Sequence, residues 1–271
     1  MRAMMNRFGL ARLPFTKEIA AEDLFQIPGQ ADATARLLAA VEARASAVLT
    51  GESGVGKTCL LRGLEHRLNP SRHRVTYLHH ATVSPRDFYR QLSMALGLEP
   101  KAYPSAMFRR LQAHIEELAD QQKVHPVLLL DEAQLMPTSM LEQLHILLNY
   151  RMDSRAFLSV ILVGLPELRE RLARNLLASL AARLPVRVHL EPLAAEQVGA
   201  YLHHRLRAAG STPEIFSEDA VLCIREATGG VLRKIDVLAH HCLEVAASRK
   251  GSLVDGGIVQ EAVRLCAEAL R

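Results

Sequence analysis

The stretch Gly51-Glu52-Ser53-Gly54-Val55-Gly56-Lys57-Thr58 follows the apolar run 47–49 and leads into a helical pattern that begins with Cys59. It matches the pattern G-x-x-x-x-G-K-[ST] of phosphate-binding loops, in which backbone N–H groups at a helix N-terminus converge on a phosphate. We expect Lys57 to place a positive charge beside the β- and γ-phosphates, and Thr58 to bind Mg²⁺. The alternative is a glycine-rich turn that binds nothing, and four fixed residue types in this context argue against it. Residues 51–59 are therefore the predicted nucleotide-binding residues.

A second apolar run, 126–130, ends in Asp131 and Glu132. An uninterrupted apolar run is typical of a parallel strand buried on both faces, and ligands bind at the carboxyl ends of such strands. We expect Asp131 to hold Mg²⁺ through water, and Glu132 to orient and deprotonate the attacking water. The Asn-Lys-x-Asp motif with which GTPases read guanine is absent from the sequence, so ATP is the expected nucleotide.

Strand patterns alternate with helical patterns along the first two thirds of the chain. Strands are expected at 47–50, 74–79, 126–130, 157–164 and 185–190, and helices at 30–45, 57–68, 86–96, 106–122, 137–148 and 166–177. This order predicts the α/β class, with a parallel sheet between two layers of helices and right-handed crossovers.

The strand patterns end near residue 192, and four helical segments follow, two of them preceded by the N-cap residues Ser217 and Asp255. We expect three parts: an N-terminal arm, 1–29, that passes near the adenine; an ATPase domain, 30–192; and a small helical lid domain, 193–271. Apolar residues of the arm are candidates for the wall of the adenine site, with ordinary packing as the alternative: Leu13, Pro14, Phe15 and Ile27.

The composition is that of a soluble protein with an aliphatic core, because the sequence has no tryptophan and only 4% aromatic residues. The net charge of +4 comes entirely from residues 1–190, since 191–271 hold more acidic than basic residues. This excess suggests a polyanionic partner, and a mildly basic solvated surface is the alternative. The four cysteines have no C-x-x-C spacing, and the longest apolar run, 158–165, is too short to cross a bilayer. We therefore expect a cytoplasmic protein with reduced thiols and no membrane partner.

The phosphate loop, the Asp-Glu strand, Arg183 before the fifth strand and the run Gly-Gly-Val-Leu-Arg233 together resemble an AAA+ ATPase. More closely, the chain resembles the ExeA/TniB group, which includes ATP-binding subunits of transposons related to TnsC and, more distantly, IstB. The resemblance covers nearly the whole chain and is carried by motifs at 8–19, 128–134, 147–153, 164–168 and 227–233.

The resemblance implies roles for two arginines. Arg233 matches the lid arginine that contacts the γ-phosphate, and Arg183 matches the finger that reaches a neighbouring subunit's nucleotide; a surface charge is the alternative for each. Leu165 stands where the group usually has glutamine, so the polar group expected at the end of the fourth strand is missing. Leu232 likewise replaces a common proline. We therefore expect slow hydrolysis, with Asn149 as the first candidate to complete the site.

The expected function is that of an ATP-dependent regulator of DNA transposition. Such a protein assembles as a homo-oligomer, a ring or a helical filament, on double-stranded DNA without sequence preference, and recruits or activates a DDE-type transposase. Basic residues without interleaved aromatics favour duplex over single strands: Arg72, Arg74, Lys101, Arg109 and Arg110. Two alternatives are an ExeA-like motor ATPase in secretion or cell-wall assembly, and a nucleotide-dependent switch that binds protein alone. ExeA carries a membrane segment and a wall-binding domain, and neither is recognised in this sequence.

Overall fold

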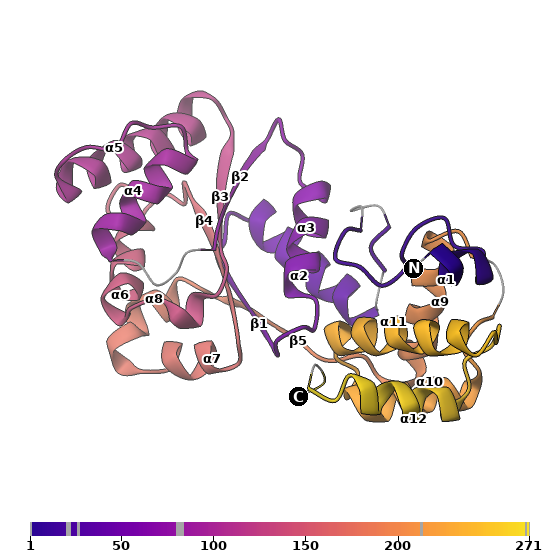
Figure 1. Ribbon diagram of the computed structural model, residues 1–271. Helices are drawn as coiled ribbons and strands as arrows, with labels where there is room; N and C mark the ends of the chain where they lie inside the picture. Colours follow the sequence, from indigo (N-terminus) through magenta and orange to yellow (C-terminus); the bar gives the residue numbers. More distant parts are fainter. Residues whose placement is uncertain are drawn as a thin grey trace. The chain divides into compact units, whose positions relative to one another are not determined.

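The structure is a computed structural model that describes residues 2–19, 23–25, 28–79, 84–211, 214–268 and 270. Its internal contacts divide the chain into two compact units (Figure 1). An α/β unit comprises Ala31–Glu52 and Leu60–Leu190, and a helical unit comprises Met1–Gln30, Ser53–Cys59 and Glu191–Arg271. The phosphate loop therefore belongs to the same unit as the C-terminal helices.

The α/β unit is built on a five-stranded parallel sheet with the order β2-β3-β4-β1-β5. Its strands are β1 (Ala47–Gly51), β2 (His73–Leu78), β3 (His125–Leu130), β4 (Ser159–Gly164) and β5 (Val186–Leu190). Every residue of β1, β3 and β4 is buried, whereas the edge strands β2 and β5 contain buried, half-buried and exposed residues. This is the burial that the uninterrupted apolar runs require of central strands. The predicted fold class is confirmed.

Helices cover both faces of the sheet (Figure 1). One face carries α2 (Pro28–Glu42) and α3 (Lys57–Arg67), and the other carries α4 (Pro85–Ala95), α5 (Pro104–Glu116), α6 (Thr138–Leu147), α7 (Glu167–Leu172) and α8 (Ala178–Ala182). The α4–α8 layer and the sheet face beneath it share one continuous apolar core. The sheet therefore has the two helical layers that the alternating sequence pattern predicts.

Two helices differ from the sequence prediction. The helix expected over 166–177 ends at Leu172, because the backbone is extended at Arg174 (φ −71°, ψ 141°), and the 3₁₀ turn η3 (Asn175–Leu177) and α8 follow. The helix expected over 106–122 ends as an α-helix at Glu116 and continues as the π-helical turn η1 (Glu117–Gln121). Apolar spacing alone does not reveal either change in backbone geometry.

The helical unit contains α9 (Ala195–Ala208), α10 (Glu218–Thr228), α11 (Leu232–Ser248) and α12 (Gly256–Leu265). The Ser217 and Asp255 side chains accept the N–H groups of Ala220 and Ile258, which confirms both predicted N-caps. None of the helices in the described part of the chain has both the length and the apolar character needed to cross a membrane.

The N-terminal segment packs into the core of the helical unit. It begins with a helix that the sequence reasoning did not predict, α1 (Arg2–Arg7). Arg205 of α9 donates from Nε to the Pro14 carbonyl and from Nη2 to the Thr16 carbonyl, each at 2.7 Å. The Phe15 ring is buried against Phe216, with ring centroids 6.2 Å apart. Leu13 packs on the same core, so the contacts favour packing over an adenine wall; Ile27 lies outside the described residues.

Candidate active site

The phosphate loop has the backbone that its glycines allow. Gly54 and Gly56 have φ angles of +85° and +100°, in the region that favours glycine, and α3 begins directly afterwards at Lys57. A Cβ atom on Gly54 would lie 2.8 Å from the Cβ of Arg233, and one on Gly56 would lie 2.9 Å from Leu232 Cδ1. Conformation therefore requires both glycines, and the close approach of α11 is a second requirement at Gly54, where the neighbouring atom is a Cβ rather than the end of a flexible side chain.

The first turn of α11 holds the phosphate loop directly. The Arg233 N–H donates to the Gly54 carbonyl at 3.1 Å, and its Nη1 donates to Ser53 Oγ at 3.2 Å. On the other side, Gln30 Nε2 donates to the Val55 carbonyl at 3.4 Å. The structure thus brings Arg233 to the loop, at the place where a phosphate chain would lie.

The remaining loop residues present a cradle for a phosphate group. Lys57 is buried at the first residue of α3, with 8% of its surface exposed, and the exposed Thr58 follows it. Gly51 is the buried last residue of β1, Glu52 is exposed, and Cys59 is half-buried. A helix N-terminus with a lysine and a hydroxyl fits a Mg²⁺-bound polyphosphate, so the residues present suit the nucleotide that the fold implies.

Asp131 follows β3 and is buried, with 5% of its surface exposed. Its Oδ1 accepts the Glu132 N–H at 2.9 Å, and its Oδ2 accepts the hydroxyl of Tyr77, on β2, at 2.8 Å. Burial and the contact with Asp131 raise the pKa of Tyr77, so its hydroxyl stays protonated and donates. The sequence reasoning missed Tyr77, because only the pairing of β2 with β3 places it beside the aspartate.

Glu132 is the exposed carboxylate of the site, and it has a left-handed backbone (φ 54°, ψ 34°). Its Oε2 accepts Nε2 of Gln134 at 2.6 Å. The Oε1 of Gln134 in turn accepts the Leu165 N–H, at the end of β4, at 3.1 Å. Gln134, in the 3₁₀ turn η2 (Ala133–Leu135), was not singled out from sequence, although the motif Asp-Glu-Ala-Gln contains it.

Asn149 and Arg183 meet at a different place in the α/β unit. Arg183 Nη2 donates to Asp153 Oδ2 at 2.7 Å, and the Asp153 N–H donates to Asn149 Oδ1 at 3.1 Å. The intervening turn has left-handed backbone at three successive residues, Arg151, Met152 and Asp153, and Met152 is 97% exposed. The structure therefore pairs Asn149 with the loop that holds Arg183, whereas the side chain in contact with Glu132 is Gln134.

Two of the cations expected to bind DNA lie beside one histidine. His114 of α5 is close enough to Arg74 of β2 and Arg110 of α5 for their charges to act on it. Burial, together with these two guanidinium groups, lowers the pKa of His114 and outweighs the opposing effect of Glu117. Arg74 and Arg110 are exposed, so two guanidinium groups lie near His114 towards the β2 edge of the sheet, with Glu117 beside the same histidine.

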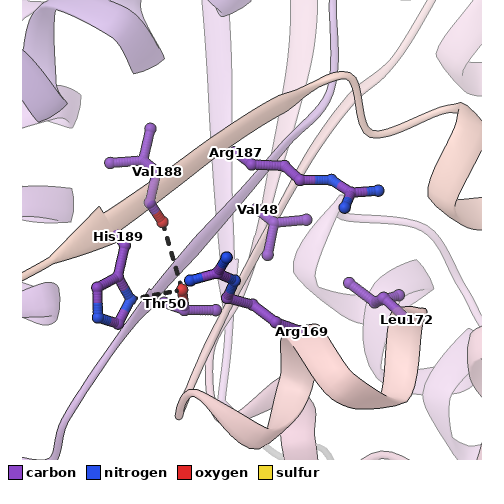
Figure 2. Close-up of a pocket in the computed structure, with 7 residues that line it drawn as sticks. All are labelled: Val48, Thr50, Arg169, Leu172, Arg187, Val188 and His189. Atoms are coloured by element: carbon purple, nitrogen blue, oxygen red, sulfur yellow. Dashed lines mark hydrogen bonds between the residues drawn. The ribbon is translucent and has the colours of Figure 1, made fainter.

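A small cavity lies on the opposite edge of the sheet, where α7 faces β1 and β5 (Figure 2). Thr50 Oγ1 is 3.0 Å from His189 Nδ1 and donates weakly to the Val188 carbonyl at 3.4 Å. Among the described residues that line the cavity, Arg169 and Arg187 carry positive charge and none is acidic, so the cavity is positively charged. In the sheet, β4 separates β1 from β3, and the cavity is therefore distinct from the carboxylates after β3.

Sequence comparisons find one matching domain family and a partly matching relative. Residues 41–172 match the family model of the AAA domain. The chain is 33% identical over 257 residues to the general secretion pathway protein A of Aeromonas hydrophila. The aligned residues cover 93% of this chain but only 46% of that protein. The chain thus spans less than half of this curated relative.

Solved structures share the fold at low identity. Cdc6p of Pyrobaculum aerophilum superposes with a TM-score of 0.75 at 15% identity, over 93% of this chain and 70% of that one. The ORC1 protein of Aeropyrum pernix, solved in complex with DNA, gives a TM-score of 0.65 at 18% identity, over 93% of this chain and 68% of that one. At this identity the two structures show a shared fold alone, and the match to the AAA-domain family model supports ATPase activity.

Proposed function

We propose that this chain, an AAA-domain P-loop ATPase, uses ATP to assemble with copies of itself on duplex DNA and then recruits or activates a DDE-type transposase. The observation that carries the ATP-dependent part is the phosphate loop held by the lid arginine, Arg233, which contacts Gly54 and Ser53. A nucleotide bound there contacts both the loop and α11, so the helical unit responds to whether a nucleotide is bound.

Each residue of the site has a defined task in this proposal. Lys57 and Arg233 neutralise the phosphates, and Thr58 and Asp131 would hold Mg²⁺. The ion would add positive charge beside the phosphate oxygens when bound. Glu132, exposed next to the buried Asp131, orients the water and takes its proton.

Assembly rests on Arg183. Its guanidinium is held by Asp153, which is itself held by Asn149, so the side chain is already oriented before a neighbour arrives. In trans, Arg183 stabilises charge on the neighbouring subunit's phosphates, as an arginine finger does. Many weak DNA contacts then act together in one assembly.

The motifs shared with the transposon ATP-binding subunits support transposition, and the surface around Arg74 and Arg110 supports DNA as the polyanion. A second candidate is a motor ATPase in secretion or cell-wall assembly, which the identity of 33% to a secretion protein favours. That role requires a membrane partner. A third role, a switch that binds protein alone, requires no DNA.

Duplex binding separates these roles. Fluorescence anisotropy of a labelled random duplex is measured with a non-hydrolysable ATP analogue and with ADP, each across a salt series. The proposal predicts tighter binding with the analogue and a steep loss of affinity with salt, because phosphate contacts release counterions. Equal affinity with the two nucleotides, or no binding at low salt, would contradict the proposal and favour the protein-only switch or the motor.

A further inference from the structure

We infer that Gln134 is a positioning residue for Glu132, and that it supplies from η2 the polar group that Leu165 lacks at the end of β4. The inference rests on the proposed role of Glu132 as the base. It concerns how that carboxylate is oriented, and it offers a reason why an apolar residue at 165 is compatible with turnover.

The side-chain amide of Gln134 connects two strand ends. Its Nε2 donates to Glu132 Oε2 at 2.6 Å, in the turn after β3, and its Oε1 accepts the Leu165 N–H at 3.1 Å, after β4. Because β3 and β4 are hydrogen-bonded neighbours, these two ends lie side by side. The glutamine thus ties the carboxylate to a fixed point of the sheet.

The orientation of the amide follows from chemistry. A backbone N–H can only donate, so the group facing Leu165 must be the amide oxygen, and the amino group must then face Glu132. Within the described residues, the second N–H of this amino group and Oε1 of Glu132 have no hydrogen-bond partner. A donor and an acceptor therefore remain side by side for a water molecule or a phosphate oxygen.

The surroundings leave Gln134 little freedom. A Cβ atom on Gly164 would lie 2.5 Å from Gln134 Oε1, so only glycine at the end of β4 leaves room for the amide. Arg171 of α7 fixes the backbone on the other side: its guanidinium donates to the Gln134 carbonyl and, at 2.7 Å, to the Met136 carbonyl. A side chain placed this firmly can orient a carboxylate whose own backbone is left-handed.

A purely structural role for Gln134 is the competing explanation, and two substitutions separate it from positioning. Gln134→Glu keeps the length and the oxygen that accepts the Leu165 N–H, but it replaces the donor to Glu132 with a negative charge. Gln134→Met keeps only the length. The control is Gln122, an exposed glutamine outside the site, changed in the same two ways. Its Nε2 donates to Glu117 Oε1 at 3.4 Å.

Turnover and nucleotide affinity are measured for each variant. Positioning predicts that both Gln134 variants lose about tenfold or more in kcat, with the Kd of a fluorescent ATP analogue within about twofold of wild type. The Gln122 variants should match wild type in both. Wild-type kcat in Gln134→Glu would overturn the inference, and so would a parallel loss of analogue binding and thermal midpoint in both variants.

A double substitution tests whether Gln134 acts through Glu132. If it does, Gln134→Met added to Glu132→Gln lowers kcat no further, because the orienting contact has lost the base it serves. A full second loss would overturn the inference. If Glu132→Gln alone turns over at the wild-type rate, the assignment of the base fails instead, so the two failures are distinguishable. Should Gln134→Met not fold, Gly164→Ala displaces the same amide and is expected to give the same loss of kcat.

Discussion

The two ends of the parallel sheet use polar residues in opposite ways. At the carboxyl ends, β1 runs into the phosphate loop and β3 into Asp131 and Glu132, and an exposed carboxylate retains capacity for a ligand. At the amino ends, His73, His125 and Ser159 begin β2, β3 and β4 and are all buried. His125 Nε2 is 2.8 Å from Ser159 Oγ, so these groups bond to each other.

The polar residues at the carboxyl ends of the strands therefore serve the chemical function, whereas those at the amino ends serve the stability of the fold. Polar groups at the carboxyl ends are oriented by neighbours such as Gln134 and Tyr77, yet they remain open to a ligand. At the amino ends, Ser159 bonds to His125, and Ser46 Oγ accepts the Val160 N–H at 2.9 Å. Substitutions at the carboxyl ends should therefore change function without unfolding the protein, and those at the amino ends should do the reverse.

The largest effect is expected at the phosphate loop. Lys57→Ala should abolish ATP binding, by about a hundredfold or more, because the phosphates lose the loop's own cation. Titration with a fluorescent ATP analogue measures the affinity, and circular dichroism should show an unchanged fold. Retained affinity would mean that the loop is not the main phosphate site.

A smaller effect is expected from subunit mixing. Arg183→Ala and Lys57→Ala should each be inactive in hydrolysis, because one lacks the finger and the other lacks the nucleotide. Mixed in equal amounts, they should regain part of the wild-type rate at interfaces where an intact finger meets an intact loop. Absence of recovery, with mixed assembly verified by pull-down of differently tagged subunits, would place Arg183 outside the neighbour's site.

Substitutions at the two edges of the sheet should differ in their effect on DNA binding. Arg74→Ala with Arg110→Ala should lower the salt slope of duplex binding by about 1.8, since each lost phosphate contact lowers it by about 0.9. The matched control removes the same charge at the opposite edge, with Arg169→Ala and Arg187→Ala, and should leave the slope unchanged. An equal decrease for both pairs would show that only net charge matters.

The last expected effect concerns pH and the amino ends of the strands. Burial, with the charges of Arg44 and His73, lowers the pKa of His125 to about 4, below its ordinary value of 6.5. Because the unfolded chain takes up this proton more readily, the stability contributed by neutral His125 is present above pH 6.5 and is lost as the pH falls towards 4. The loss reaches at most about 3 kcal/mol.

Thermal midpoints between pH 8 and pH 5 test this dependence. His125→Gln keeps a hydrogen-bonding group beside Ser159 but cannot titrate, so its midpoint should fall less than that of the wild type. An identical pH dependence in the two proteins would show that His125 does not couple protonation to folding.

The sequence predicted those parts of the site that depend on local backbone. Residues 52–56 form a loop between β1 and α3 because their glycines permit it, and Asp131 follows a buried strand because 126–130 is uniformly apolar. Contacts between elements were not predictable in this way. Tyr77 reaches Asp131 only through the pairing of β2 with β3, and Gln134 reaches Leu165 only because β3 lies beside β4.

The assignment of Asn149 shows the same limit. Its place just after the predicted helix 137–148 did not reveal that its Oδ1 accepts the Asp153 N–H, in the loop that pairs with Arg183. The break in the predicted helix at Arg174 was unpredictable for a similar reason, because the extended backbone at Arg174 does not alter the spacing of apolar residues. Spacing identifies which residues face the core, but it does not identify their partners across elements.

The most direct test of the contrast between the two ends measures ATP turnover and thermal midpoint together for Glu132→Gln and Ser159→Ala. Glu132→Gln should lose about tenfold or more in turnover, keep ATP binding and keep its midpoint. Ser159→Ala should unfold at lower temperature, because a buried histidine loses its partner at a cost of about 1–3 kcal/mol, while turnover per folded molecule stays unchanged. Wild-type turnover in Glu132→Gln, or a specific loss of turnover in Ser159→Ala, would contradict the account.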